Sequence, residues 1–78
     1  MPLPVQREID ARGSFCPGPL MELIRAVRGS EVGDLIAVLS KDPGSRTDIP
    51  AWLKKAGHDL VAMEDEVGYT RFVARKVR

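Results

Sequence analysis

Cysteine is nearly absent from this chain. Cys16 is the only one among 78 residues, so no internal disulfide can form. There is no Cys-x-x-Cys pair for dithiol redox chemistry, and one cysteine with one histidine falls short of the four ligands of a usual zinc site. The longest uninterrupted apolar run, residues 35–39, is far shorter than the roughly 20 residues that span a bilayer. Residues 1–4 lack the basic and apolar regions of a signal peptide. We therefore expect a cytoplasmic protein with no membrane segment, no metal and no cofactor.

A large excess of charge is also missing. The chain has 12 Lys and Arg against 11 Asp and Glu, and a net charge of +1 gives no strong overall field to attract nucleic acid or a membrane. A chain of this length buries only about 60% of its unfolded surface, so nearly every apolar residue must enter one core. No internal repeat or linker divides the chain. We expect a single domain over residues 1–78 that works as a monomer.

The one cysteine lies in residues 14–19, with the sequence Ser-Phe-Cys-Pro-Gly-Pro, directly before an apolar helical pattern. Proline is tolerated in the first turn of a helix, so we predict Cys16 as the helix N-cap and Pro17 as the first helical residue. A helix N-terminus carries about half a positive charge, which lowers the pKa of a thiol there below the free value of about 8.5. Because Pro17 and Pro19 have no N–H, we expect the N–H of Gly18 to face the sulfur. The alternative is a small, buried and inert cysteine.

The first predicted helix ends at Gly29, and Leu20, Leu23 and Val27 form an apolar stripe along it at helical spacing. Apolar runs and turn signals predict the remaining elements. The predicted order is a strand at 5–10, a helix at 17–28, a central strand at 35–39, a helix within 46–56, and strands at 58–64 and 69–77.

The start of the second helix is ambiguous in the sequence. Ser45 and Asp48 are spaced like a capping box. Pro50 would interrupt a helix that began so early, so Asp48 as the N-cap with Pro50 in the first turn is the preferred interpretation. Trp52 is expected in the core because it lies at helical spacing from Ile49.

Two helices and four short strands predict an α+β fold, a two-layer sandwich of order βαβαββ. Both helices should pack on one face of a mixed four-stranded sheet. A right-handed crossover makes the first two strands parallel, and the last two strands should form an antiparallel hairpin. The cysteine would then lie at an edge of the sandwich.

Several short motifs in this order resemble the TusA-like (SirA-like) sulfur-carrier family over almost the whole chain. The Cys-Pro-x-Pro motif at the start of the first helix is the most specific of them. The motifs are Asp10-Ala11-Arg12-Gly13, Cys16-Pro17-Gly18-Pro19, Gly33-Asp34, Asp42-Pro43, Asp48-Ile49-Pro50 and Gly57-His58.

The resemblance implies that Cys16 accepts sulfane sulfur as a persulfide, with Pro17, Gly18 and Pro19 as supporting residues. The donor would be a cysteine desulfurase or a rhodanese-like sulfurtransferase, and the acceptor another protein in tRNA thiolation, sulfur oxidation or cofactor sulfuration. The chain would then be a sulfurtransferase-type carrier and not a stand-alone enzyme. Family members of the tRNA type often carry glutamate where this chain has Gly18, and loss of that carboxylate favours the thiolate.

Basic side chains on the helical side are candidates for docking an acidic partner protein, although they could equally be ordinary solvated residues. They are Arg25, Arg28, Lys41, Arg46, Lys54 and Lys55. His58 is expected to face solvent and not to act as a base for Cys16. Asp42 and Asp48 are expected to shape the loop and cap the second helix.

Two other functions remain open from the residues alone. One is a non-catalytic regulatory or interaction module that uses the helical face, with Cys16 incidental. The other is direct binding of nucleic acid, which we consider weaker because no aromatic stacking platform accompanies the basic residues near the C-terminus. These residues are Arg71, Arg75, Lys76 and Arg78.

Overall fold

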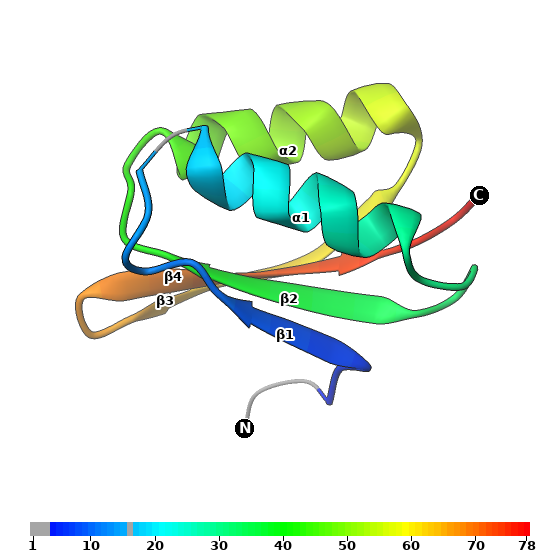
Figure 1. Ribbon diagram of the computed structural model, residues 1–78, viewed down its shortest axis with the longest axis horizontal. Helices are drawn as coiled ribbons and strands as arrows, with labels where there is room; N and C mark the ends of the chain where they lie inside the picture. The colour runs from blue at the N-terminus through cyan, green and yellow to red at the C-terminus, as the bar shows by residue number, and fades with distance from the viewer. Residues whose placement is uncertain (1–3, 16) are drawn as a thin grey trace.

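The computed structural model describes residues 4–15 and 17–78 and has the predicted two-layer α+β architecture (Figure 1). Two helices lie side by side on one face of a four-stranded sheet, and the other face carries no helix. In the described residues, neither helix is long and apolar enough to cross a membrane. The elements are β1 (Arg7–Asp10), α1 (Gly18–Arg28), β2 (Leu35–Ser40), α2 (Ser45–Ala56), β3 (Asp59–Glu66) and β4 (Tyr69–Arg75).

The sheet has the strand order β1-β2-β4-β3. β1 pairs with β2 in parallel, and β4 pairs antiparallel with both β2 and β3. The predicted parallel pair, the predicted hairpin and the central position of β2 are therefore confirmed. β3 and β4 are joined by the two residues Val67 and Gly68, and Gly68 has a φ of 84°, which glycine adopts without strain.

The core lies between the sheet and the helices. Leu23 of α1 and Ile49 of α2 are fully buried there and meet Phe72 of β4. Full burial of a side chain of this size is worth roughly 1.5–3 kcal/mol. Trp52 is half-buried and packs against the same cluster, which confirms its predicted place in the core.

The predicted start of the second helix is wrong. α2 begins at Ser45, and Asp48 lies inside it, because the turn before the helix already supplies its first hydrogen bonds. The N–H groups of Ser45 and Asp48 donate to the carbonyls of Asp42 and Gly44 at 3.1 and 2.9 Å. The hydroxyl of Ser45 does not cap the helix; it lies 2.9 Å from the hydroxyl of Ser40, and both residues are buried. Pro50 is tolerated because it removes only one intrahelical hydrogen bond near the helix start.

The helix-free face of the sheet is held together by one buried arginine. Arg71 of β4 is 6% exposed, although no helix covers it. Its Nε donates to Glu8 of β1 at 3.0 Å, and its Nη1 donates to Glu64 of β3 at 2.8 Å. The side chain thus links both edge strands to β4. Arg71 is therefore part of the fold and not one of the surface cations that a nucleic acid would need.

Candidate functional site

The connection that leads into the cysteine motif is anchored to the sheet. The N–H of Ala11 donates to the carbonyl of Leu39 in β2 at 2.9 Å, and the N–H of Ser14 donates to the carbonyl of Ala11 at 3.0 Å. Ala11 is itself buried. The start of the motif therefore has a fixed place beside the end of the central strand.

The side chain of Arg12 links the same connection to Asp10 of β1 and Tyr69 of β4. Its Nε and Nη2 donate to the two carboxylate oxygens of Asp10 at 2.9 and 2.8 Å, and its guanidinium carbon lies 4.8 Å from the ring centroid of Tyr69. The side-chain hydrogen bonds from Arg12, with that from its backbone N–H, lower the pKa of Asp10 to about 2. The connection is thus linked to the start of β4 as well as to β1.

Cys16, and with it the predicted exposure of its thiol, lies outside the described residues. The chain on either side of it is described. Phe15 is 76% exposed and Pro17 is also exposed. Both sequence neighbours of Cys16 are therefore exposed.

The structure corrects two details of the predicted helix start. The N-cap of α1 is Pro17, and the helix begins at Gly18, one residue later than predicted. The reason is that the Pro17 carbonyl accepts the helical hydrogen bond from Met21, at 2.9 Å. The N–H of Gly18 does not face the sulfur as a free donor, because it donates to the carbonyl of Phe15 at 2.7 Å.

Pro19 and Gly18 determine how the first turn of α1 packs against the rest of the fold. Pro19 is buried and anchors the first turn in the core. Gly18 packs against the preceding connection so closely that a Cβ there would lie 2.9 Å from the Cβ of Ser14. The absence of a side chain at position 18 therefore allows the two segments to approach each other.

Two open hollows are lined by residues of the loop after β2 and of the β3–β4 turn. Both segments lie at the end of the molecule where α1 starts (Figure 1). The hollows have volumes of about 380 and 400 Å³, and Lys41, Gly68 and Tyr69 line both of them. Lys41 is exposed and shares this end of the fold with the cysteine motif. It is the predicted docking residue that lines both hollows.

Arg46 is at the same end but is engaged within the fold. Its Nη1 donates to the carboxylate of Asp65 and, at 3.1 Å, to the hydroxyl of Thr70. The hydrogen bonds from Arg46 and Thr70 lower the pKa of Asp65. Arg46 thus ties α2 to the β3–β4 hairpin.

The other predicted docking residues lie at the far end of the helices. Arg25 and Arg28 are in the last turn of α1, and Lys54 and Lys55 are in the last turn of α2. Arg25 approaches Glu22 at 4.0 Å, as its spacing predicts. The structure therefore divides the six predicted docking cations between opposite ends of the molecule.

His58 is predicted to face solvent, but the structure shows its ring in contact with other residues. Its Nδ1 accepts the N–H of Val77 at 3.0 Å, and its ring centroid lies 5.8 Å from that of Trp52. Burial lowers the pKa of His58. It follows α2, a helix of 12 residues, whereas α1 starts at the end of the molecule where α2 begins (Figure 1). A helix of this length spans about 18 Å, which separates His58 from the start of α1. We therefore keep the expectation that His58 does not act as a base for Cys16.

Two exposed apolar residues near the motif were not singled out from the sequence. Phe15 precedes the cysteine, and Val67, at the tip of the β3–β4 turn, is 99% exposed. Both stand in segments that the sequence predicts as connections, where an apolar residue has no core to enter. Within residues 4–15 and 17–78, no group of three His, Asp or Glu side chains could hold a metal ion.

Comparison with known proteins finds a family model and close relatives. The model of "Sulfurtransferase TusA" matches residues 7–76. A putative sulfur carrier protein of Archaeoglobus fulgidus is 53% identical over 70 residues, covering 90% of this chain and 96% of that protein. The sulfur carrier protein TusA of Pseudomonas syringae pv. syringae is 43% identical, covering 95% of this chain and 88% of that protein.

A solved structure has the same fold. The crystal structure of a SirA-like protein from Desulfitobacterium hafniense superposes with a TM-score of 0.81 and covers 94% of this chain and 100% of its own. Its sequence is 23% identical, so this similarity concerns the fold alone.

Proposed function

We propose, from the premise that this chain belongs to the TusA family and is a sulfur carrier, that Cys16 carries the sulfur as a persulfide. The observation that carries this proposal is the position of the only thiol of the chain, which directly precedes the N-cap of α1 between two exposed residues. The partial positive charge of the helix N-terminus favours the thiolate there.

The transfer needs no oxidant or reductant from outside. The Cys16 thiolate attacks the terminal sulfur of a donor persulfide, R–S–SH. A sulfur–sulfur bond forms to Cys16, the donor's sulfur–sulfur bond breaks, and the donor leaves as the thiolate R–S⁻ while the proton stays on the transferred sulfur. Delivery repeats this exchange with the acceptor thiolate as the nucleophile.

The lack of a second cysteine suits this role. A neighbouring thiol would attack the persulfide, form a disulfide and release the cargo as sulfide. The chain has no such thiol, so the cargo can leave only through an external nucleophile. This also favours a reducing cytoplasm as the place of transfer, where donor and acceptor thiols stay available.

Protein partners follow from the function, because a sulfur carrier has to meet a donor and an acceptor. We propose a cysteine desulfurase or a rhodanese-like protein as the donor. Phe15 and Lys41 are the contact residues that we assign to the motif end: the first offers an exposed apolar ring, the second an exposed charge that speeds association with an acidic surface.

Intact-mass spectrometry after incubation with a persulfide donor tests the site. The wild-type chain should gain one sulfur atom, lose it on treatment with dithiothreitol, and gain none when the thiol is first alkylated. Cys16→Ser should gain none. If Cys16→Ser still delivered sulfur or kept the biological activity, the interaction-module alternative would replace the carrier mechanism.

The reactivity of the thiol provides a second test. Because the Gly18 N–H is engaged by Phe15, the helix N-terminus is the remaining cause that we invoke for a lowered pKa of Cys16. The rate of alkylation measured against pH should give an apparent pKa below about 8.5. A value at or above that of free cysteine would remove this part of the mechanism.

A further inference from the structure

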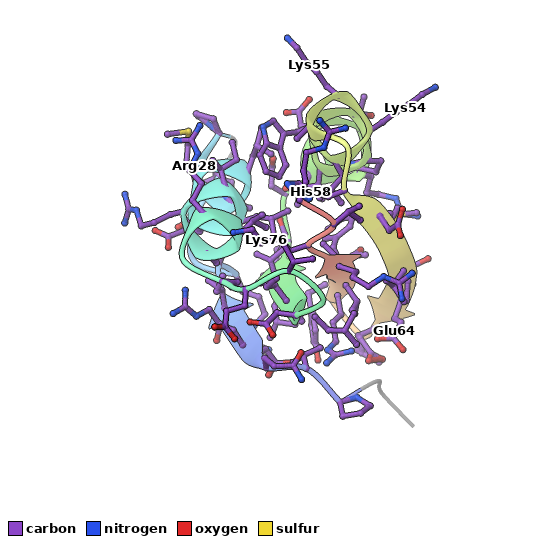
Figure 2. The ribbon with its side chains drawn as sticks, turned by 90° about the vertical axis from the view of Figure 1, so that its right-hand side faces the viewer. Arg28, Lys54, Lys55, His58, Glu64 and Lys76 are labelled. Atoms are coloured by element: carbon purple, nitrogen blue, oxygen red, sulfur yellow. The ribbon has the colours of Figure 1, made fainter. Side chains whose placement is uncertain are left out.

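The near-zero net charge conceals a separation of charge between the two ends of the molecule. Among the described side chains, eight basic and three acidic ones lie at the end formed by the C-termini of both helices, while three basic and five acidic ones lie at the motif end. Figure 2 looks onto this basic end. The basic end comprises Arg7, Arg25, Arg28, Lys54, Lys55, Arg75, Lys76 and Arg78 against Glu31, Asp34 and Asp59.

Part of this charge serves the fold. Arg75 pairs with Asp59 at 3.1 Å, and Lys76 donates to the carbonyl of Ser30 at 2.6 Å. The C-termini of α1 and α2 both point to this end, and together they carry about one negative charge. An excess of five positive side chains is several times what two helix dipoles need. Lys54 and Lys55 also project away from the molecule in Figure 2.

The charges at this end also act on His58. Burial is the main cause that lowers its pKa, and the charges of Lys76 and Arg78 lower it further, against a smaller opposite effect of Asp59. The guanidinium of Arg78 lies over Gly57, where a Cβ would come within 2.5 Å of it. The Arg78 side chain therefore also lies at the basic end.

The two ends act separately in solution. The molecule extends 30 Å along its longest axis, which runs from the motif end to the basic end in Figure 1. The Debye length at physiological ionic strength is about 8 Å, so the acidic side chains at one end do not cancel the field at the other.

The basic end suits a protein better than a nucleic acid. Exposed apolar side chains, Val32 at 66% and Val77 at 44%, stand among its cations. Apolar side chains gain free energy when a protein partner buries them, whereas a phosphate backbone offers them no apolar surface. Two aromatic rings lie near this end: Trp52 packs against the core, and the half-buried His58 ring lies 5.8 Å from it, so neither is an isolated surface platform for stacking bases.

We propose that the basic end is a second docking surface, which binds an acidic surface or acidic segment of a protein partner and leaves the cysteine motif free. A carrier held in this way can present its motif to a donor or acceptor site while it stays bound. The inference goes beyond sulfur transfer and does not depend on it, because none of its residues belongs to the motif.

Binding of a short polyglutamate peptide at low salt, followed by NMR of the ¹⁵N-labelled full chain, tests the proposal. Amide shifts should move at Val32, Gly57 and Val77 and stay unchanged at Gly13 and Gly68. Lys55→Glu should weaken binding about fivefold. Thr47→Glu/Val67→Glu is the matched control at the motif end, since it lowers the net charge by the same two units at exposed residues with no assigned contact, and it should change affinity less than about twofold.

Three results would overturn the assignment: no binding of the peptide, equal losses for the Lys55 variant and the Thr47/Val67 double variant, or tighter binding of a single-stranded RNA of matched charge. Cys16→Ser should bind the peptide as the wild type does. This variant separates the two proposals, because it abolishes sulfur loading and leaves the basic end intact.

Discussion

Placing one methyl group at position 18 tests how tightly the cysteine motif is packed. In Gly18→Ala the new Cβ would lie 2.9 Å from the Cβ of Ser14, whereas carbon atoms in contact prefer about 3.5–4.0 Å. The Ser14 Cβ is fixed to a backbone that is hydrogen-bonded to Ala11, so the clash can be relieved only by moving the connection or the helix start. Overpacking of this kind costs about 1–3 kcal/mol. Alanine restores less than about 1 kcal/mol by restricting the unfolded chain, so we expect a net loss of about 1–2 kcal/mol.

Urea unfolding followed by Trp52 fluorescence measures this loss, because Trp52 packs against the core. Gly13→Ala is the matched control: a Cβ there meets nothing within 4 Å, and the variant should be as stable as the wild type or slightly more stable. The double variant Ser14→Gly/Gly18→Ala should recover most of the loss, with a coupling energy of about 1–2 kcal/mol. If Gly18→Ala were as stable as Gly13→Ala, or if the two changes were additive, the close approach described for the motif would be wrong.

Three further predictions concern charged residues. Arg71→Met should destabilise the fold by about 2 kcal/mol in urea unfolding, because it leaves two carboxylates without their cation. Arg75→Met removes an exposed ion pair and should cost less than about 1 kcal/mol. Equal losses for the two variants would refute this difference. Arg12→Gln should return the Asp10 pKa from about 2 to roughly 4 in a ¹³C NMR titration. In the wild type, the stabilisation by the Asp10–Arg12 pair should persist above pH ~4 and disappear as the pH falls towards 2. An unchanged Asp10 pKa in the variant would contradict the assigned cause. The His58 ring should titrate below its ordinary pKa of 6.5. The neutral ring therefore stabilises the fold above that pH, and the stabilisation declines on acidification. An NMR midpoint at or above 6.5 would show that burial does not control the pKa of His58.

The fold could be predicted from the sequence because its signals are local. Leu23 and Val27 recur at helical spacing, and both are buried on α1. The run at 35–39 is continuous because β2 has a neighbouring strand on each side and is buried along most of its length. Strand ends were less certain, since β1 begins at Arg7 and not at residue 5, and β3 extends to Glu66.

The missed details depend on contacts between residues far apart in the chain. The state of His58 depends on the N–H of Val77, 19 positions later. The burial of Arg71 depends on Glu8, 63 positions earlier. No local pattern reports these pairs, and the separation of charge between the two ends likewise becomes visible only when the topology is known.

The position of β4 determines when this protein can become functional during synthesis. β4 is the last strand of the chain, yet it lies between β2 and β3 and brings Phe72 into the core. Synthesis proceeds from the N-terminus, so a growing chain that has completed both helices still lacks the strand that joins the two halves of its sheet. A nascent chain therefore cannot close this fold, or take up cargo in its native form, before β4 has left the ribosome.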